Sequence, residues 1–347
     1  MQPITHALRQ LGKLVTGLVG LLTAQVGNQG QGCAARGLPA ATCGVPLHVG
    51  PGKRRPWIED TARHSFEPGT GGKLTLTAAV GDVEVKAVNS NAVTIEIVRR
   101  VYADEQEAAA RLLEKLLVEV AQQDQDVTVR VRLRRDTADD ERRRISLHVQ
   151  IFVPRHYNLD VSTVGCFRAD DLQGEVKVAT AGGDISLGHI QGAVIAASAG
   201  GRIDLARVDG EVVVNSAGGK LRAGQLTGSV KLDTAGGSVS IEDAGGALEV
   251  ATDGGSFTAH LSRQPPAASN INTAGGRLVL SLAQRVGVEL DAAATHGRVR
   301  FDDAESAGPK SKRNVLQTSI NGGGPQLILR SADGSIYLTR RPPAGHK

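Results

Sequence analysis

A glycine returns at every ninth residue through the middle of this chain, and that spacing limits the folds the chain can adopt. The eleven lattice positions are Gly165, Gly174, Gly183, Gly192, Gly201, Gly210, Gly219, Gly228, Gly237, Gly246 and Gly255. The residues two and four positions after each of these glycines are apolar. Because residues two apart on a β-strand point to the same face, each nine-residue unit predicts one short strand with two inward side chains.

The true repeat is eighteen residues long, because the residue seven positions after the glycine alternates between large and small, as at Leu172 and Ala181. Each repeat therefore has two strands and two unlike corners. One corner reads Thr/Ser-Ala-Gly-Gly, where glycine can supply a positive φ and the hydroxyl can bond nearby backbone. An unbroken period keeps each corner stacked on the one below. The pattern predicts an all-β fold, a parallel β-solenoid with 18-residue, two-strand rungs.

Composition agrees with this fold. A chain of 347 residues with 40% hydrophobic residues can bury a sizeable core, but only 3% of its residues are aromatic. The core must therefore be filled by Val, Ile, Leu and Ala, which suits short stacked strands. The 40 basic and 36 acidic residues are interspersed, so the net charge of +4 is no indication of nucleic acid, and we expect no such partner.

The first fifty residues differ from the rest of the chain. Arg9 and Lys13 precede an apolar run at 14–24, the pattern of a secretory signal, and this run is too short to span a bilayer comfortably. We interpret residues 1–50 as a signal-like leader, removed or disordered, with a short amphipathic leader as the alternative. Export to the periplasm or the cell surface is expected, with a cytoplasmic location as the alternative. Any membrane contact would be made through this leader.

Three cysteines, Cys33, Cys43 and Cys166, are too few for a disulfide scaffold, and none of them forms a C-x-x-C pair. A Cys33–Cys43 bridge and free thiols are both open. We expect no metal site, no cofactor and no catalytic residue in this chain.

Residues 66–160 are predicted to form a capping region of strands and one helix, followed by a solenoid domain at 161–340. Alternating runs predict the strands, at 73–77, 82–86, 92–97, 127–133 and 145–153. The segment 104–123 is predicted to be an amphipathic helix, with Asp104 capping its start.

Several motifs together resemble one known family. They are repeated Thr/Ser-Ala-Gly-Gly-x-Ile-x-Leu units, intervening Gly-x-Val-x-Val, a preceding Val-x-Val-Pro, and a closing Ile-Asn-Gly-Gly-Gly followed by Asp-Gly-Ser-Ile. Over about residues 66–340 the chain resembles the bacterial putative-adhesin family of β-solenoid envelope proteins, a domain of unknown function. The resemblance implies a non-enzymatic, adhesin-like module of the cell envelope and supplies no catalytic residue.

Three more specific kinds of repeat protein also have to be compared with this pattern. Left-handed acyltransferase helices take eighteen residues per turn, but as three hexapeptides, whereas the period here is nine. Calcium-binding rolls need repeated carboxylates after the double glycines, whereas this chain has Asp184, Arg202, Lys220 and Ser238 there. Polysaccharide-processing β-helices are the enzymatic alternative, since they use charged residues on one face of parallel rungs. The histidines His189, His260 and His296 are expected to lack partners aligned with the lattice and to be surface residues.

The outward face of the strands after the double glycines carries the candidate binding face. Its members are Asp184, Arg202, Asp204, Lys220 and Arg222, and the ladders continue through Ser238, Ser240, Ser256 and Thr258. Such polar ladders could bind a glycan, an acidic polymer or an envelope protein, and the alternative is a solvated face that keeps the solenoid soluble. The oligomeric state is left open.

Overall fold

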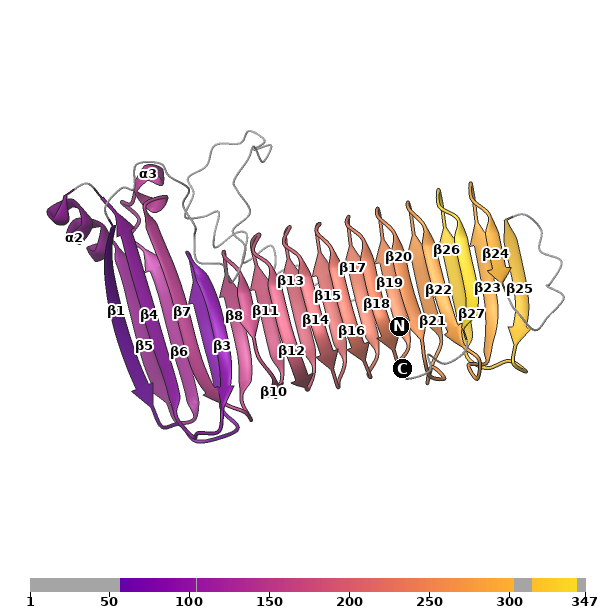
Figure 1. Cartoon of the computed structure of the whole chain (residues 1–347), viewed down its shortest axis with the longest axis horizontal. Helices are drawn as coiled ribbons and strands as arrows, with labels where there is room; N and C mark the ends of the chain where they lie inside the picture. Colours follow the sequence, from indigo (N-terminus) through magenta and orange to yellow (C-terminus); the bar gives the residue numbers. More distant parts are fainter. Residues whose placement is uncertain (1–56, 104, 303–313, 342–347) are drawn as a thin grey trace. The chain divides into compact units, whose positions relative to one another are not determined.

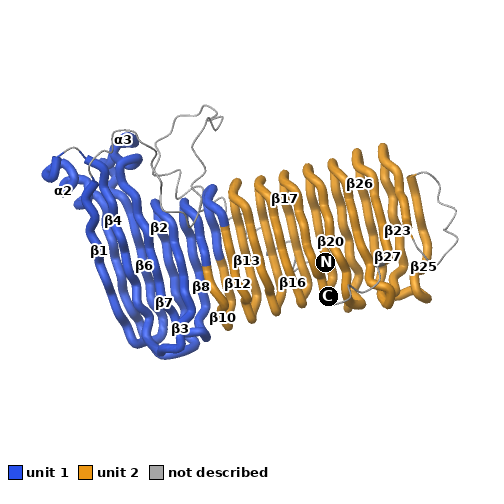
Figure 2. Tube along the Cα trace, in the orientation of Figure 1, with its two compact units in different colours: residues 1–168, 178–184 blue, residues 169–177, 185–347 orange. Residues whose placement is uncertain are grey.

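The computed structural model describes residues 57–103, 105–302 and 314–341 (Figure 1). The chain forms two compact units, residues 1–168 with 178–184 (unit 1) and residues 169–177 with 185–347 (unit 2), coloured separately in Figure 2. The predicted leader, Cys33, Cys43 and the predicted helix cap Asp104 lie outside the described residues. Within the described ranges, no helix is both long enough and apolar enough to cross a membrane.

The described residues of unit 1 contribute strands to two β-sheets and form two short helices. The strands of its first sheet are β1 (Trp57–Phe66), β4 (Val93–Tyr102), β7 (Ile145–Pro154) and β3 (Asp82–Val88), in that order. Those of its second sheet are β8 (Asn158–Thr163), β2 (Lys73–Ala78), β6 (Asp126–Leu133) and β5 (Leu116–Gln123). The helices are α2 (Gln106–Glu114) and α3 (Asp139–Arg142). Pairing is antiparallel at β1–β4, β4–β7 and β5–β6 and parallel at β3–β7, β2–β6 and β2–β8.

The five strands predicted for the capping region are confirmed, but the predicted helix at 104–123 is wrong in its second half. The helix ends at Glu114, and residues 116–123 form β5. Leu116 and Val120 fit a period of two as well as a helical period, and β5 pairs along its whole length with β6. The turn between them is made by Asp124, whose φ is +52°. Pairing in a full antiparallel ladder therefore stabilises this segment more than continuing the helix would.

The sequence analysis also missed β1, which precedes the first predicted strand. Its residues alternate between exposed and half-exposed, and none of them is buried. A strand without a buried face carries too little hydrophobic contrast to be found by its pattern. Cys166, near the end of unit 1, is 5% exposed and disulfide-bonded.

Unit 2 is built from two sheets of mainly parallel strands. Sheet A contains, in spatial order, β12 (Ile185–Gln191), β14 (Ile203–Val208), β16 (Leu221–Leu226), β18 (Val239–Ala244), β20 (Phe257–Leu261), β22 (Leu278–Ala283), β27 (Ile336–Arg341) and β24 (Val299–Asp302). Sheet B contains β13 (Val194–Ser198), β15 (Val212–Ser216), β17 (Val230–Thr234), β19 (Leu248–Thr252), β21 (Ser269–Thr273), β26 (Gln326–Ser331), β23 (Val288–Ala294) and β25 (Val315–Ile320). The short β10 (Leu172–Gln173) pairs with β12, and the chain passes between the units within β9 (Phe167–Ala169) and β11 (Val176–Thr180).

The register of unit 2 confirms the predicted solenoid. Ile203 of β14 faces Leu221 of β16, and Val212 of β15 faces Val230 of β17, each pair eighteen residues apart. The two inward side chains of each strand are buried, as Val212 and Val214 are at 1% exposure. Burying two aliphatic side chains per strand contributes on the order of 3–6 kcal/mol before chain entropy is counted. Neighbouring rungs supply that burial, so the fold is an all-β parallel solenoid with two strands per rung.

The lattice glycines are required for two different reasons at the two corners. At the Thr/Ser-Ala-Gly-Gly corner, Gly219 has φ +85° and Gly237 has φ +86°, which L-residues rarely adopt. At the other corner, Gly228 and Gly246 have no left-handed φ, but a Cβ on Gly246 would overlap the carbonyl of Gly228 one rung below. At this second corner it is the close stacking of backbones that excludes a side chain.

The last strands of the chain are not the last strands in space. In sheet A, β27 lies between β22 and β24, and in sheet B, β26 lies between β21 and β23 (Figure 1). The chain thus makes β23, β24 and β25 first and then returns to insert its final rung. The antiparallel strand β25 covers the outer edge of β23.

Candidate functional site

The structure brings four of the five predicted face residues together on sheet A of unit 2. Asp204 of β14 lies directly opposite Arg222 of β16. Arg202 and Lys220 immediately precede these strands, and the backbone N–H of Ile203 donates to the Lys220 carbonyl at 2.9 Å, which stacks the two corners. Asp184 belongs to unit 1, where its carbonyl accepts from Phe167.

The charged residues of this face differ in how exposed they are and in whether an opposite charge lies beside them. Lys220 and Arg222 are exposed, and within the described ranges neither forms an ion pair. Asp204 is only partly exposed, and its position opposite Arg222 partly offsets the positive charge of that arginine. The face can therefore attract an anion through Lys220 and Arg222, but its net field is small.

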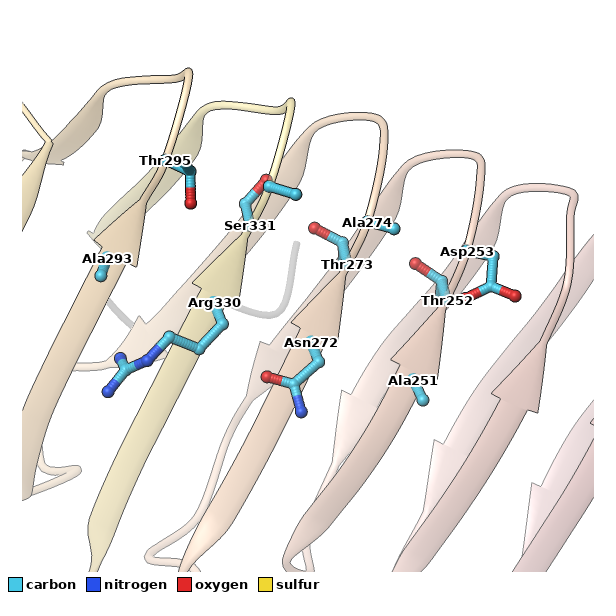
Figure 3. Close-up of a pocket in the computed structure, with 11 residues that line it drawn as sticks. Ala251, Thr252, Asp253, Asn272, Thr273, Ala274, Ala293, Thr295, Arg330 and Ser331 are labelled. Carbon is cyan, nitrogen blue, oxygen red and sulfur yellow. The ribbon is translucent and has the colours of Figure 1, made fainter.

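A groove of about 390 Å³ lies on sheet B, across the ends of β19, β21, β26 and β23 (Figure 3). Thr252, Thr273 and Ser331 stand in register along one row, and the hydroxyls of Thr252 and Thr273 have no hydrogen-bond partner. Asn272 and Arg330 form the next outward row. The side chains of Thr252, Thr273 and Ser331 are buried, so the accessible polar groups of the groove are those of Asp253, Asn272, Thr295 and Arg330.

Arg330 in this groove is held by a carboxylate. Its Nη2 lies 2.5 Å from Asp291, and its Nη1 donates to the Asp291 carbonyl at 2.8 Å. The hydrogen bond from Arg330 lowers the pKa of the Asp291 carboxyl, with partial burial opposing that shift. Sequence reasoning missed this pair, because Asp291 and Arg330 come from strands that become neighbours only through the inserted last rung.

A second groove, of about 340 Å³, is lined by two carboxylates of sheet B, Glu289 and Asp291. Glu289 and Asp291 share the outward face of β23 two residues apart, which places their Cα atoms about 6.6 Å from each other. Ser319 donates to Glu289 at 2.6 Å. A glycosidase needs one carboxyl kept protonated near neutral pH, whereas the pKa of Asp291 is lowered. Asp291 is therefore unsuited to be a general acid.

Each of the three histidines bonds a side chain from another strand or corner, although none of these partners is eighteen residues away, where the lattice would place it. His189 Nε2 lies 2.6 Å from Asp209, His260 Nδ1 lies 3.1 Å from Ser281, and His296 Nδ1 lies 3.0 Å from Asp333. The hydrogen bond from His189, followed by that from Arg207, lowers the pKa of Asp209. These pairs join neighbouring rungs at the surface. In the described part of the chain, no cluster of three or more His, Cys, Asp or Glu residues is arranged to hold a metal ion.

These features define the class of the protein, which is a parallel β-solenoid with polar ladders on its outward faces. The chain matches the Toastrack DUF4097 family over residues 72–339 and belongs to that family. The resemblance seen in the sequence motifs is thereby confirmed.

Several solved structures are similar to this chain at low identity. A "putative lipid binding protein" from Parabacteroides distasonis is 12% identical and covers 80% of this chain and 96% of its own, with a TM-score of 0.46. A "putative cell adhesion protein" from Clostridium sporogenes is 12% identical, covers 82% and 100%, and has a TM-score of 0.23. A "putative adhesin" from Parabacteroides merdae is 13% identical, covers 81% and 95%, and has a TM-score of 0.28. No curated protein matches the chain.

Proposed function

We propose that this protein is a non-enzymatic, adhesin-like β-solenoid that acts as an interaction or scaffold module of the cell envelope. The observation that carries the proposal is the way unit 2 distributes its polar groups. They form long rows along two sheets, in register from rung to rung, instead of converging on one reactive centre. Rows of this kind suit an extended ligand that is contacted at many points, each of which is weak.

The proposed partner is a glycan or another envelope protein. Lys220 and Arg222 of the predicted face supply exposed positive charge, and the groove at Asn272 supplies amide and hydroxyl groups. The proposed location is the periplasm or the cell surface. The signal-like pattern at the N-terminus supports export, and so does the disulfide bond of Cys166, since disulfides persist in oxidising compartments.

A column of immobilised polygalacturonate tests the binding proposal at low salt. The change Arg202→Ser, Lys220→Ser, Arg222→Ser should reduce retention and leave the melting curve nearly unchanged. Equal retention of this variant and the wild type would remove these residues from the proposed site. If the wild-type protein is not retained on this column or on a panel of other envelope glycans, the glycan part of the proposal is wrong.

The alternative, a polysaccharide-processing enzyme of the β-helix type, makes a different prediction. Its best location is the pair Glu289 and Asp291, the two carboxylates of the second groove. Incubation with a panel of acidic and neutral polysaccharides should release no reducing or unsaturated ends. Release of such ends by the wild type, lost in Glu289→Gln, would establish the enzyme and contradict the proposed function.

A further inference from the structure

Three arginines and a tyrosine gather at the far end of the outward face of sheet A. Arg277 precedes β22, Tyr337 lies on β27, and Arg298 and Arg300 belong to the β24 segment. We call these four residues the arginine–tyrosine cluster. The guanidinium carbon of Arg277 lies 5.1 Å from the centroid of the Tyr337 ring, and that of Arg300 lies 6.0 Å from it. Two guanidinium groups therefore share one aromatic ring.

The cluster carries positive charge that the described protein does not neutralise. All three arginines are exposed, and within the described ranges none of them forms an ion pair with a carboxylate. Asp302 lies on the same strand face as Arg300, two residues further along β24. Stacking on a ring holds a guanidinium in place while leaving its N–H groups directed outward, and a planar fork of this kind matches a carboxylate or sulfate bidentately.

Hydroxyl side chains join this cluster to the predicted face. The row that contains Arg222 continues through Ser240, Thr258, Val279 and Tyr337 to Arg300. The row before it runs from Lys220 through Ser238, Ser256, Arg277 and Ser335 to Arg298. From β16 to β24 these rows cross six strands of sheet A, a distance of about 24 Å. The face thus presents positive charge at both ends and mainly hydroxyls between them.

We propose that the arginine–tyrosine cluster is an anion-binding site for a linear acidic polysaccharide, which lies across the strands of sheet A with its carboxylate or sulfate groups on the arginines. This proposal names the ligand class of the proposed envelope interaction and therefore rests on that function. The serine and threonine rows bond sugar hydroxyls, and the Tyr337 ring supplies a surface for the face of a sugar ring. Glu242 and Asp243, both on β18, are acids in the middle of this stretch of sheet A, and Asp243 accepts a hydrogen bond from Gln225.

The same face is poorly suited to the two other common polyanions. A single-stranded nucleic acid needs several aromatic platforms for successive bases, and this stretch of sheet A offers Tyr337 alone. A membrane surface is bound by apolar side chains that enter the lipid, and Val279 is the outward apolar residue in the row. The hydroxyl rows distinguish a polysaccharide from both.

Part of this cluster follows the repeat pattern of the sequence, but the sequence does not show that its four residues come together. Arg277 follows Gly275 and Gly276, as Arg202 follows Gly200 and Gly201. Tyr337 joins Arg277 and Arg300 only because β27 is inserted between β22 and β24. The inserted last rung is therefore what builds the site.

Binding of the full-length protein to soluble polygalacturonate and dextran sulfate, followed by isothermal titration, tests the proposal. The change Arg277→Ser, Arg298→Ser, Arg300→Ser should weaken both affinities about tenfold, and neutral dextran should not bind. A charge-matched control, Arg130→Ser, Arg135→Ser, Arg143→Ser, removes three exposed arginines from unit 1 and should change affinity less than about twofold. Tyr337→Phe keeps the ring and should bind as the wild type does, whereas Tyr337→Ser should weaken binding.

Three outcomes would overturn the proposal. The first is equal loss in the cluster variant and the charge-matched control, because net charge would then explain binding. The second is equally tight binding of a thymidine oligonucleotide or of phosphatidylglycerol vesicles. The third is loss of binding in the variant of Arg202, Lys220 and Arg222 with none in the cluster variant, a result that keeps the proposed function and removes this site. Unchanged melting temperatures exclude misfolding as the cause.

Discussion

Replacing Gly237 with alanine should destabilise the solenoid strongly, whereas the same change at Gly236 should not. Gly237 has φ +86°, and a Cβ built there would overlap the carbonyl oxygen of Gly219 on the rung below. Alanine in a left-handed conformation costs roughly 1–2 kcal/mol. Making room for a methyl group between stacked backbones costs a further ~1–3 kcal/mol. The expected loss in the free energy of unfolding is therefore about 2–5 kcal/mol.

Gly236 is the matched control, because it is the adjacent residue in the same corner. A Cβ at Gly236 would meet nothing closer than the Ala217 carbonyl oxygen at 3.9 Å, and its φ is not left-handed. Gly236→Ala should be neutral or stabilise by about 0.4–1 kcal/mol through the unfolded chain. Urea unfolding followed by far-ultraviolet circular dichroism measures both changes. If the two variants lose stability equally, or if Gly237→Ala costs less than about 1 kcal/mol, the account of the corner is refuted.

Three further predictions test the register and the titrating groups. Deleting residues 219–236 should leave a folded protein with one rung fewer, whereas deleting 219–227 should lower the unfolding midpoint far more because it moves every later strand onto the other sheet; similar midpoints would contradict the two-strand rung. Burial, then the charge of Asp126, raises the pKa of Tyr157 to about 12 from 10.0, so stability should fall as the pH rises from about 10 to 12, and Tyr157→Phe should remove that loss and the late absorbance change at 295 nm. The pKa of Asp291 is lowered from 3.8 by the hydrogen bond from Arg330, so the unfolded state takes up protons first as the pH falls below about 4, and acid unfolding of Asp291→Asn should depend less on pH there.

The repeat could be predicted from the sequence because each rung is formed by residues that are close together along the chain. Each strand of the regular solenoid pairs with one eighteen residues away. Its inward face is marked by two apolar residues at alternate positions, as at Val212 and Val214. The error at residues 116–123 has a physical cause, since that segment fits both a helix and a strand and its choice was decided by pairing with β6. The local sequence pattern does not show which strand this segment will pair with.

Sites formed by neighbouring rungs could be predicted from the sequence, whereas sites formed by segments far apart in the chain could not. The neighbouring positions of Arg202, Asp204, Lys220 and Arg222 follow directly from the lattice, and the register of β14 and β16 places them as expected. The groove at Arg330 and the arginine–tyrosine cluster were not predicted. Both depend on β26 and β27 being inserted out of chain order, and no periodic pattern encodes that insertion.

The insertion of β26 and β27 also determines which strand edges stay open until synthesis is complete and where this chain could gain rungs. Until the ribosome has produced the final strands, β21 and β22 have no neighbour on their outer side, so a chain that stops after residue 325 keeps open strand edges that invite pairing with other chains. The C-terminal strands therefore cover edges that a shortened chain would leave open. New rungs can be gained by duplicating eighteen-residue units within the regular array, whereas additions after β27 would not extend the stack.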